Sequence, residues 1–145
     1  MSSIDLNLMK NAIQQSKIAL EKGEVPVGAI IECNKKIISK SYNNVELLKD
    51  PTAHAEMLAI SSACSFLKSK YLTNCTIYIT LEPCPMCMSA IILSKIKNIV
   101  YAASDPENGG ISKYSLSTNK ISIVKGIMKS EAENILKTFF EKIRK

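Results

Sequence analysis

The spacing of apolar residues along this chain switches between one that is typical of helices and one that is typical of strands. It predicts helices and strands that alternate from one end of the chain to the other. Between residues 6 and 22 the apolar residues recur at helical spacing, and Gly23 is placed to end that helix. Two runs rich in β-branched residues follow at 27–33 and 36–41, and residues 34–35 between them suit a tight turn. The N-terminal part therefore predicts a helix followed by a β-hairpin.

The remainder of the chain continues this alternation. In order, the pattern predicts a helix at 53–67, a strand at 76–81, a helix at 86–94, strands at 98–103 and 121–125, and a final helix at 130–144. Pro85 suits the first turn of its helix, and Ser130 with Glu133 suits a capping box on the last one. Residues 111–119 favour neither a helix nor a strand. We therefore expect one α/β domain over residues 1–145, built on a sheet that helices cover.

The composition is typical of a globular protein without a membrane segment. Of the 145 residues 46% are apolar and 22% are charged, and no apolar run approaches the roughly 18 residues of a membrane span. The N-terminus lacks the apolar core of a signal sequence, so we expect a cytoplasmic protein. Five cysteines, an odd number, argue against a disulfide scaffold, and Cys33, Cys64 and Cys75 are expected to be small buried apolar residues.

Positive charge is concentrated towards the C-terminus. The formal net charge is +6, and the stretch from Lys95 to Lys145 contains ten Lys or Arg residues against five Asp or Glu residues. A basic region of this kind is compatible with a phosphate-rich partner, and equally with a solvated, lysine-rich surface. Charge alone therefore leaves RNA binding open.

Two short motifs bring together the residue types that bind zinc. The sequence P-T-A-H-A-E contains His54 and Glu56, and the sequence L-E-P-C-P-M-C contains Cys84 and Cys87. One imidazole and two thiols make three ligands, and the chain has no second histidine, whereas a structural zinc site normally has four protein ligands. A position left for water implies hydrolysis, because zinc lowers the pKa of bound water towards neutrality. Glu56 is then the candidate that moves protons to and from that water.

The spacing of each motif predicts where on a helix it lies. Residues two apart point to different sides of a helix, so His54 and Glu56 serve one site most easily from a first turn. Cys84 and Cys87 are three apart and also fall where a helix begins. We therefore expect two helix N-termini to converge on the metal, where their partial positive charge favours thiolates. The alternative is a structural zinc site whose fourth ligand is Cys33, Cys64 or Cys75.

The pattern H-x-E followed by P-C-x-x-C resembles the zinc-dependent nucleobase deaminases, in which the glutamate is the general acid and base and not a ligand. The closer resemblance is to the bacterial tRNA-specific adenosine deaminases, since four stretches occur in that family's order. They are V-P-V-G at 25–28, Y-N-N at 42–44, D-P-T-A-H-A-E at 50–56 and T-L-E-P-C at 80–84. The resemblance reaches the final helix but departs after Asn108, where the family has a longer segment. It implies a three-layer α/β/α fold of the cytidine deaminase-like type, with a mixed sheet of about five strands flanked by helices.

For function, the resemblance implies hydrolytic deamination of adenosine to inosine at the wobble position of a tRNA anticodon. One Zn²⁺ per subunit, held by His54, Cys84 and Cys87, activates a water that attacks C6 of adenine, and Glu56 moves the protons. The base lies in the loop of the anticodon stem-loop, so extruding it costs little. The family acts as a homodimer, and we expect the same here.

Four further residues match positions that meet the substrate in this family. Asn43 matches an asparagine that reads the base, and Val27 a residue that packs against it. Ala55 matches a position whose backbone faces the base, and Asp105 a loop residue near the RNA. Taken alone, Asn43 is better interpreted as a turn residue, Val27 as a strand core residue and Ala55 as an ordinary helix former, and the Asp-Pro context of Asp105 equally suits a turn. Basic residues that would hold the phosphates of the anticodon stem are Lys137, Lys142, Arg144 and Lys145.

Two alternatives stay open at this point. A free-base or nucleoside deaminase, acting on guanine or cytidine, would use the same zinc site, although the basic charge and Asn43 favour RNA. A zinc-stabilised RNA-binding module without catalysis would have the same ligands, but its Glu56 would have no function.

Overall fold

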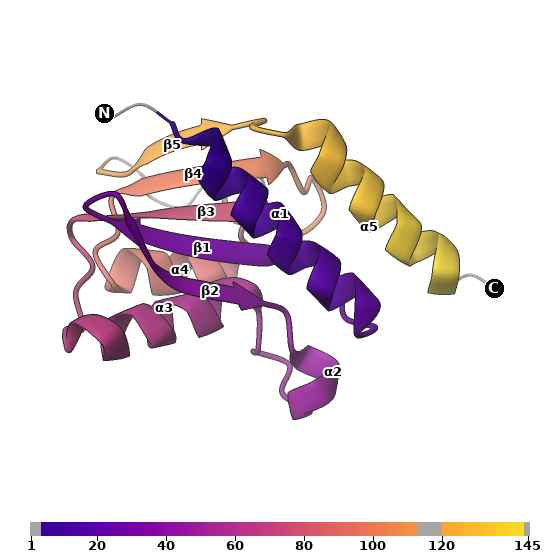
Figure 1. The fold of residues 1–145 in the computed structure, drawn as a ribbon, viewed down its shortest axis with the longest axis horizontal. Coiled ribbons are helices and arrows are strands. Elements are labelled where there is room, and N and C mark those ends of the chain that lie inside the picture. The colour runs from indigo at the N-terminus through magenta and orange to yellow at the C-terminus, as the bar shows by residue number, and fades with distance from the viewer. Residues whose placement is uncertain (1–3, 113–119, 144–145) are drawn as a thin grey trace.

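One mixed β-sheet with helices on both faces makes up the computed structural model, which describes residues 4–112 and 120–143 (Figure 1). The elements follow one another as α1 (Leu6–Glu21), β1 (Gly28–Cys33), β2 (Lys36–Tyr42), α2 (Val45–Leu48), α3 (Ala55–Leu67), β3 (Cys75–Leu81), α4 (Pro85–Leu93), β4 (Asn98–Ala103), β5 (Ser122–Lys125) and α5 (Lys129–Ile143). The expected three-layer α/β/α fold with five strands is confirmed. Arg144, Lys145 and most of the segment after Asn108 lie outside the described residues.

The sheet joins an antiparallel half to a parallel half. Its strand order is β2-β1-β3-β4-β5, with β1 antiparallel to both β2 and β3, and with β3, β4 and β5 parallel. Parallel neighbours need a crossover connection, and α4 supplies it between β3 and β4. The carboxyl ends of β3 and β4 therefore lie at the same edge of the sheet as the start of β1. The connections at this edge build the site described below.

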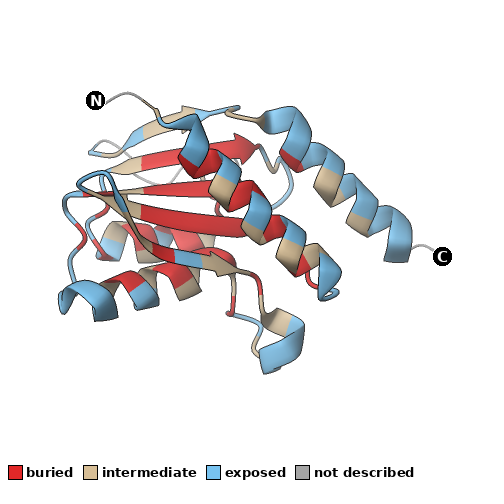
Figure 2. Ribbon diagram, viewed as in Figure 1, coloured by how far each residue is buried: buried red, intermediate tan, exposed pale blue. Residues whose placement is uncertain are grey.

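Neighbouring residues of each strand pack into different layers. Ile31 and Ile77 belong to a core cluster that includes residues of α3 and α4, whereas Ile30 and Tyr78 belong to a second cluster that includes residues of α1 and α5. Figure 2 shows the central strands buried between the two helical layers. Burial on both faces explains why these strands are continuous apolar runs instead of alternating ones.

The predicted N-terminal elements are confirmed, including their turns. Asn34 and Lys35 have φ angles of 51° and 67°, the left-handed pair that a two-residue hairpin turn requires. Gly23, at φ 77°, follows the last turn of α1, as the sequence predicts.

Gly28 lets β1 pass directly against α1, which gives a stability prediction. A Cβ atom at this position would lie 2.1 Å from the backbone oxygen of Ala12 and 2.7 Å from the backbone nitrogen of Ser16. Gly28→Ala is therefore expected to lower the free energy of unfolding by about 3 kcal/mol, because backbone atoms of the helix have to move. Urea denaturation monitored by circular dichroism measures this change.

Gly126→Ala is the matched control for that substitution. Gly126 has a φ of 84°, but a Cβ atom there meets nothing within 4 Å, so only backbone strain of about 1 kcal/mol is expected. Equal losses for the two variants would contradict the close approach of α1 and β1.

Three local expectations differ from the structure. The four-residue helix α2 was not predicted, and α3 begins at Ala55 instead of residue 53. The capping box proposed for Ser130 and Glu133 is wrong, because α5 begins at Lys129 and Ser130 therefore lies inside the helix. Met128, directly before α5, has a left-handed φ of 59°.

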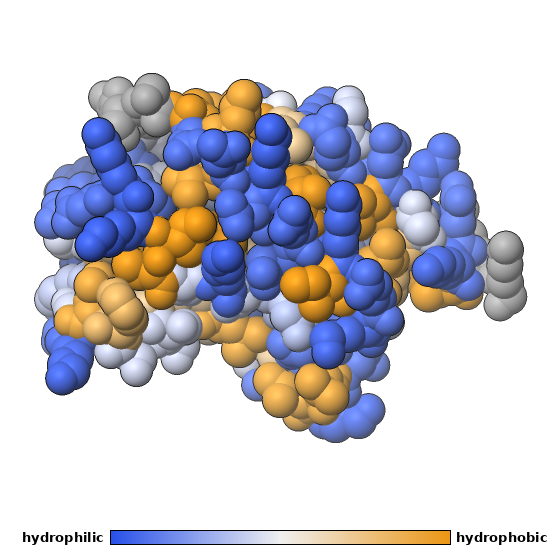
Figure 3. Space-filling view, in the orientation of Figure 1, coloured by the Kyte–Doolittle hydropathy of each residue, from blue (hydrophilic) through white to orange (hydrophobic). Residues whose placement is uncertain are grey.

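The surface carries polar side chains over the outer helices and apolar ones at α2. Figure 3 shows hydrophilic residues along α1, and a hydrophobic group over α2, where Leu47 and Leu48 are exposed. Within the described part of the chain, every helix is too short or too polar to cross a bilayer.

Candidate active site

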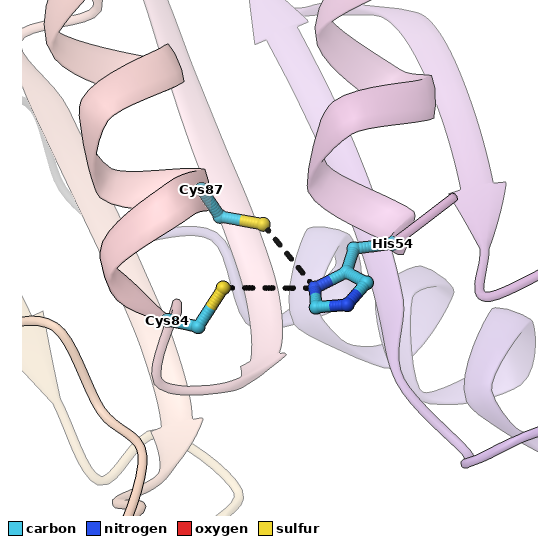
Figure 4. A group of neighbouring side chains, drawn as sticks. All are labelled: His54, Cys84 and Cys87. Atoms are coloured by element: carbon cyan, nitrogen blue, oxygen red, sulfur yellow. Dashed lines mark hydrogen bonds between the residues drawn. The ribbon is translucent and has the colours of Figure 1, made fainter. Parts of the chain in front are cut away.

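Both metal-binding motifs lie where a helix begins. His54 is the N-cap residue of α3 and Cys84 is the N-cap residue of α4, each with an extended backbone. Pro85 follows at the first position of α4, where its missing N–H has no cost. Because α3 and α4 cover the same face of the sheet, their N-termini meet beyond the carboxyl end of β3 (Figure 4). The expected convergence of two helix N-termini is confirmed.

Three ligand-type atoms converge at this point. The Nδ1 atom of His54 lies 3.6 Å from the Sγ atom of Cys84 and 3.6 Å from that of Cys87, as Figure 4 shows. In a tetrahedral zinc site, bonds of about 2.0 Å to nitrogen and 2.3 Å to sulfur place these atoms about 3.5 Å apart. The residues present therefore fit a zinc ion.

The remaining cysteines are not part of this group. Among the described residues, a cluster of three or more potential metal ligands forms only from His54, Cys84 and Cys87. Cys75 is buried in the core as expected, whereas Cys33 and Cys64 pack against the core and are only half-buried. A structural site completed by one of these thiols is therefore excluded.

A hydrogen bond links the two thiols, with Cys87 as the donor and Cys84 as the acceptor. The hydrogen bond from Cys87 lowers the pKa of the Cys84 thiol to about 4, and donating that bond to Cys84 raises the pKa of Cys87. A hydrogen bond with Cys84 also raises the pKa of His54. The positive ends of α3 and α4 favour thiolates at this point, so the site is prepared to exchange protons for a cation.

Glu56 lies in the first turn of α3, beside the three ligand atoms. Only 4% of its surface is exposed, and burial raises the pKa of its carboxyl group to about 7. Nearby His54 opposes that rise, and Cys84 adds to it, so the carboxyl group is close to both. A carboxyl group that titrates near neutral pH can both accept and return a proton during a reaction.

A cavity of about 650 Å³ opens beside these residues. Such a volume is within the range of small-molecule sites. Most of the residues that the sequence predicts to serve the site line its wall: Val27, Asn43, His54, Glu56, Cys84 and Asp105. Cys87 is fully buried, and neither it nor Ala55 is among the described residues that form the wall.

Asn43 and Ala55 are joined by a hydrogen bond. The N–H group of Ala55, the first residue of α3, donates to Oδ1 of Asn43 at 2.7 Å. The first N–H groups of a helix have no partner within the helix, and His54 provides no side-chain cap. The side chain of Asn43, which lies outside α3, therefore accepts the first N–H group in its place. Its Oδ1 atom is committed to α3, which leaves the Nδ2 amide as the group that can meet a ligand.

Two further wall residues were missed by sequence reasoning. Glu24 is 1% exposed, and its carboxylate accepts from the N–H groups of Glu46 and Leu47 at 3.0 and 2.9 Å. Phe139 reaches the cavity from α5, where the sequence predicts only a core-facing aromatic residue. The one sequence feature that could have pointed to Glu24 is its position directly before the V-P-V-G stretch, which is shared with the family.

Comparison with known proteins agrees with this site. The sequence model of the MafB19-like deaminases matches residues 4–144. A tRNA-specific adenosine deaminase of Aquifex aeolicus is 46% identical over 141 residues, which cover 94% of this chain and 93% of that protein. The corresponding protein of Bacillus subtilis is 39% identical, over 94% of this chain and 89% of its own length.

A solved structure shows the same relationship in three dimensions. It comes from studies of A-to-I editing by tRNA:A34 deaminases at the wobble position of transfer RNA, and superposes with a TM-score of 0.84. The two chains are 33% identical, with 90% of this chain and 99% of the other covered. With its fold, its His-Cys-Cys cluster and these relatives taken together, the chain belongs to the family of tRNA-specific adenosine deaminases.

Proposed function

We propose that this protein converts adenosine to inosine at the wobble position of a tRNA anticodon by hydrolytic deamination. The observation that carries the proposal is the position of Glu56, a buried carboxyl group beside the His-Cys-Cys cluster, at the wall of a cavity. The relatives named tRNA-specific adenosine deaminase, one of them 46% identical, supply the substrate class.

His54, Cys84 and Cys87 would hold the metal of the reaction. Two thiolates and one imidazole are ligands that zinc prefers, and three protein ligands are the number found in catalytic zinc sites. A zinc ion bound there would supply Lewis acidity, which lowers the pKa of a coordinated water towards neutrality. The positive ends of α3 and α4 favour the thiolate form of the two cysteines, and the negative charge of the thiolates would attract such an ion.

Glu56 would move the protons. Hydrolytic removal of an amine requires one proton to leave the water and others to reach a ring nitrogen and the departing nitrogen. The Glu56 carboxyl group, with a pKa of about 7, would accept the first and deliver it to the base. Ammonia and inosine are then the products.

Asn43 would recognise the base through its Nδ2 amide, since its Oδ1 atom is bonded to α3. Asn43→Asp keeps an acceptor for Ala55 but removes the donor, so kcat/KM is expected to fall by about tenfold to a hundredfold, at little cost in stability. Asn43→Ala should lose activity similarly and also lower the melting temperature, because the first N–H of α3 loses its partner. Steady-state kinetics and thermal melts of both variants separate the two roles. Full activity of Asn43→Asp would contradict base recognition by the amide.

The other residues expected to meet the substrate have distinct places. Val27 is 5% exposed and lines the cavity, where it would pack against the base. Asp105 also lines the wall, where it would lie near the bound RNA. Ala55 would act indirectly, because its N–H group holds Asn43 in place.

The helix α5 would contribute to binding the anticodon stem. Its Lys137 and Lys142 are exposed, and Phe139 of the same helix reaches the cavity, so phosphate groups and an unstacked base can be contacted together. We further propose that the enzyme acts as a homodimer. We also propose that it acts in the cytoplasm, where its tRNA substrate is found.

A substrate panel tests the proposed function. The purified zinc-loaded protein is incubated with an anticodon stem-loop RNA carrying adenosine at the wobble position, with guanine and with cytidine. Inosine in the stem-loop, with the other two compounds unchanged, is the expected result. Turnover of guanine or cytidine with an inert stem-loop would instead identify a free-base or nucleoside deaminase.

A further inference from the structure

Glu82 is a buried carboxylate to which the sequence assigns no chemistry. It follows the last residue of β3, two positions before Cys84, and only 2% of its surface is exposed. Its own N–H group donates to the backbone oxygen of Ala103, the last residue of β4, at 2.8 Å. Glu82 thus stands at the carboxyl ends of two parallel strands, at the edge of the sheet where the cavity lies.

Four hydrogen bonds converge on this one side chain. Its Oε1 atom accepts from the N–H group of Asp105 at 3.0 Å and from the hydroxyl group of Ser112 at 2.8 Å. Its Oε2 atom accepts from the N–H groups of Ile111 and Ser112 at 3.0 and 2.6 Å. All four donors belong to residues 105–112, the segment that leaves β4. The carboxylate therefore holds both ends of this segment.

The segment is packed closely against the same carboxylate. A Cβ atom at Gly109 would lie 2.3 Å from both Cδ and Oε2 of Glu82, so that position accepts only a glycine. The N–H group of Gly110 donates to the backbone oxygen of Pro83 at 2.7 Å. The segment thus rests on the connection that leads into α4 and Cys84.

Residues 105–112 form part of the cavity wall. Asp105 and Asn108 both line it, and so does Glu82. The Asp105 side chain is fixed in turn, because its Oδ1 atom accepts from the N–H group of Asn108 at 3.1 Å. Loss of the Glu82 carboxylate would therefore release the backbone at Asp105 and at Ser112 together, and would displace this wall.

We propose that Glu82 is a positioning residue, which fixes the 105–112 segment as the substrate-facing wall of the cavity. This inference rests on the proposed function. Glu82 acts through the segment, whereas the reacting groups belong to Glu56 and the metal ligands. Its effect should accordingly appear in binding of the RNA and not in the chemical step.

A carboxylate is required because every group that faces Glu82 is a donor. Glutamine has the same shape but only one acceptor oxygen, so its NH₂ group would face two donors whichever way it is turned. Removing one negative charge near an RNA should by itself strengthen binding. A rise in KM would therefore report a displaced wall and not a change in charge.

The test compares Glu82→Gln with Ser39→Ala, which removes a buried hydrogen bond, from the Ser39 hydroxyl group to the backbone oxygen of Ala59, at residues that do not line the cavity. With the stem-loop RNA, Glu82→Gln is expected to raise KM by about tenfold or more, to leave kcat within about threefold, and to retain one zinc per chain. Ser39→Ala should change neither constant by more than about threefold. An unchanged KM in Glu82→Gln, or a loss of kcat together with zinc, would overturn the proposal.

Hydrogen exchange provides a readout that does not depend on the substrate. The amides of Asp105, Ile111 and Ser112 should be protected in the wild type and exchange at least about tenfold faster in Glu82→Gln. If the wild type does not act on the stem-loop, the proposed function fails, while exchange still decides whether Glu82 fixes the segment. Equal exchange in both proteins would refute the proposal that Glu82 fixes the segment.

Should Glu82→Gln not fold, Glu82→Asp is measured in the same way, because it withdraws the carboxylate by one methylene group.

Discussion

Glu56→Gln is expected to lower kcat for deamination of the stem-loop RNA by at least about a thousandfold, with the zinc content unchanged. Glutamine has the same shape but cannot accept and return a proton, and Glu56 is not one of the three ligand residues. Single-turnover measurement of inosine, with metal analysis of the same sample, tests this. KM should change little, because the shape of the cavity is kept.

The matched control is Glu24→Gln, which makes the same change at another buried carboxylate of the cavity wall. Glu24 accepts hydrogen bonds from the backbone of α2 and is not one of the residues of the ligand cluster, so a loss below about tenfold is expected. If Glu56→Gln keeps all activities of the wild type, the protein is a zinc-stabilised RNA-binding module and not an enzyme of this mechanism.

Cys84→Ser is expected to weaken zinc binding by more than about a hundredfold and to abolish deamination. A serine hydroxyl stays protonated at neutral pH, whereas the Cys84 thiol has its pKa lowered to about 4 by the hydrogen bond from Cys87. The variant therefore lacks a ready anionic ligand and also the partner that Cys87 and His54 contact. Competition with a chromogenic zinc chelator measures the affinity.

Cys64→Ser serves as the control for thiol loss, because Cys64 packs against the core and is outside the ligand cluster. It should retain one zinc per chain and wild-type activity. Equal zinc loss in both variants, or normal zinc binding in Cys84→Ser, would contradict the assignment of the ligands.

The elements that could be predicted from the sequence are those whose signals are local. The turn at Asn34 and Lys35 and the strand at Asn98–Ala103 follow from residue type and period alone. The two motifs could also be placed on helix N-termini, the first because the spacing of His54 and Glu56 disfavours the middle of a helix, and the second because Pro85 suits a first helical turn.

The missed features depend on contacts between distant residues. The helix α2 is held by Glu24, which lies more than twenty positions away in the chain. The start of α3 depends on the side chain of Asn43, which accepts the first N–H of the helix. Glu82 gathers donors from residues 105–112, and no periodicity reports such a pairing. Tertiary hydrogen bonds of this kind leave no trace in a local pattern.

The most direct measurement of the central claim is a crystal structure of the zinc-loaded protein, with anomalous scattering recorded at the zinc edge. We expect one anomalous peak per chain, in contact with Nδ1 of His54 and with both sulfur atoms, and open on its fourth side to the cavity that Glu56 lines. A fourth protein ligand, such as a further cysteine or a carboxylate closing that side, would contradict a hydrolytic site.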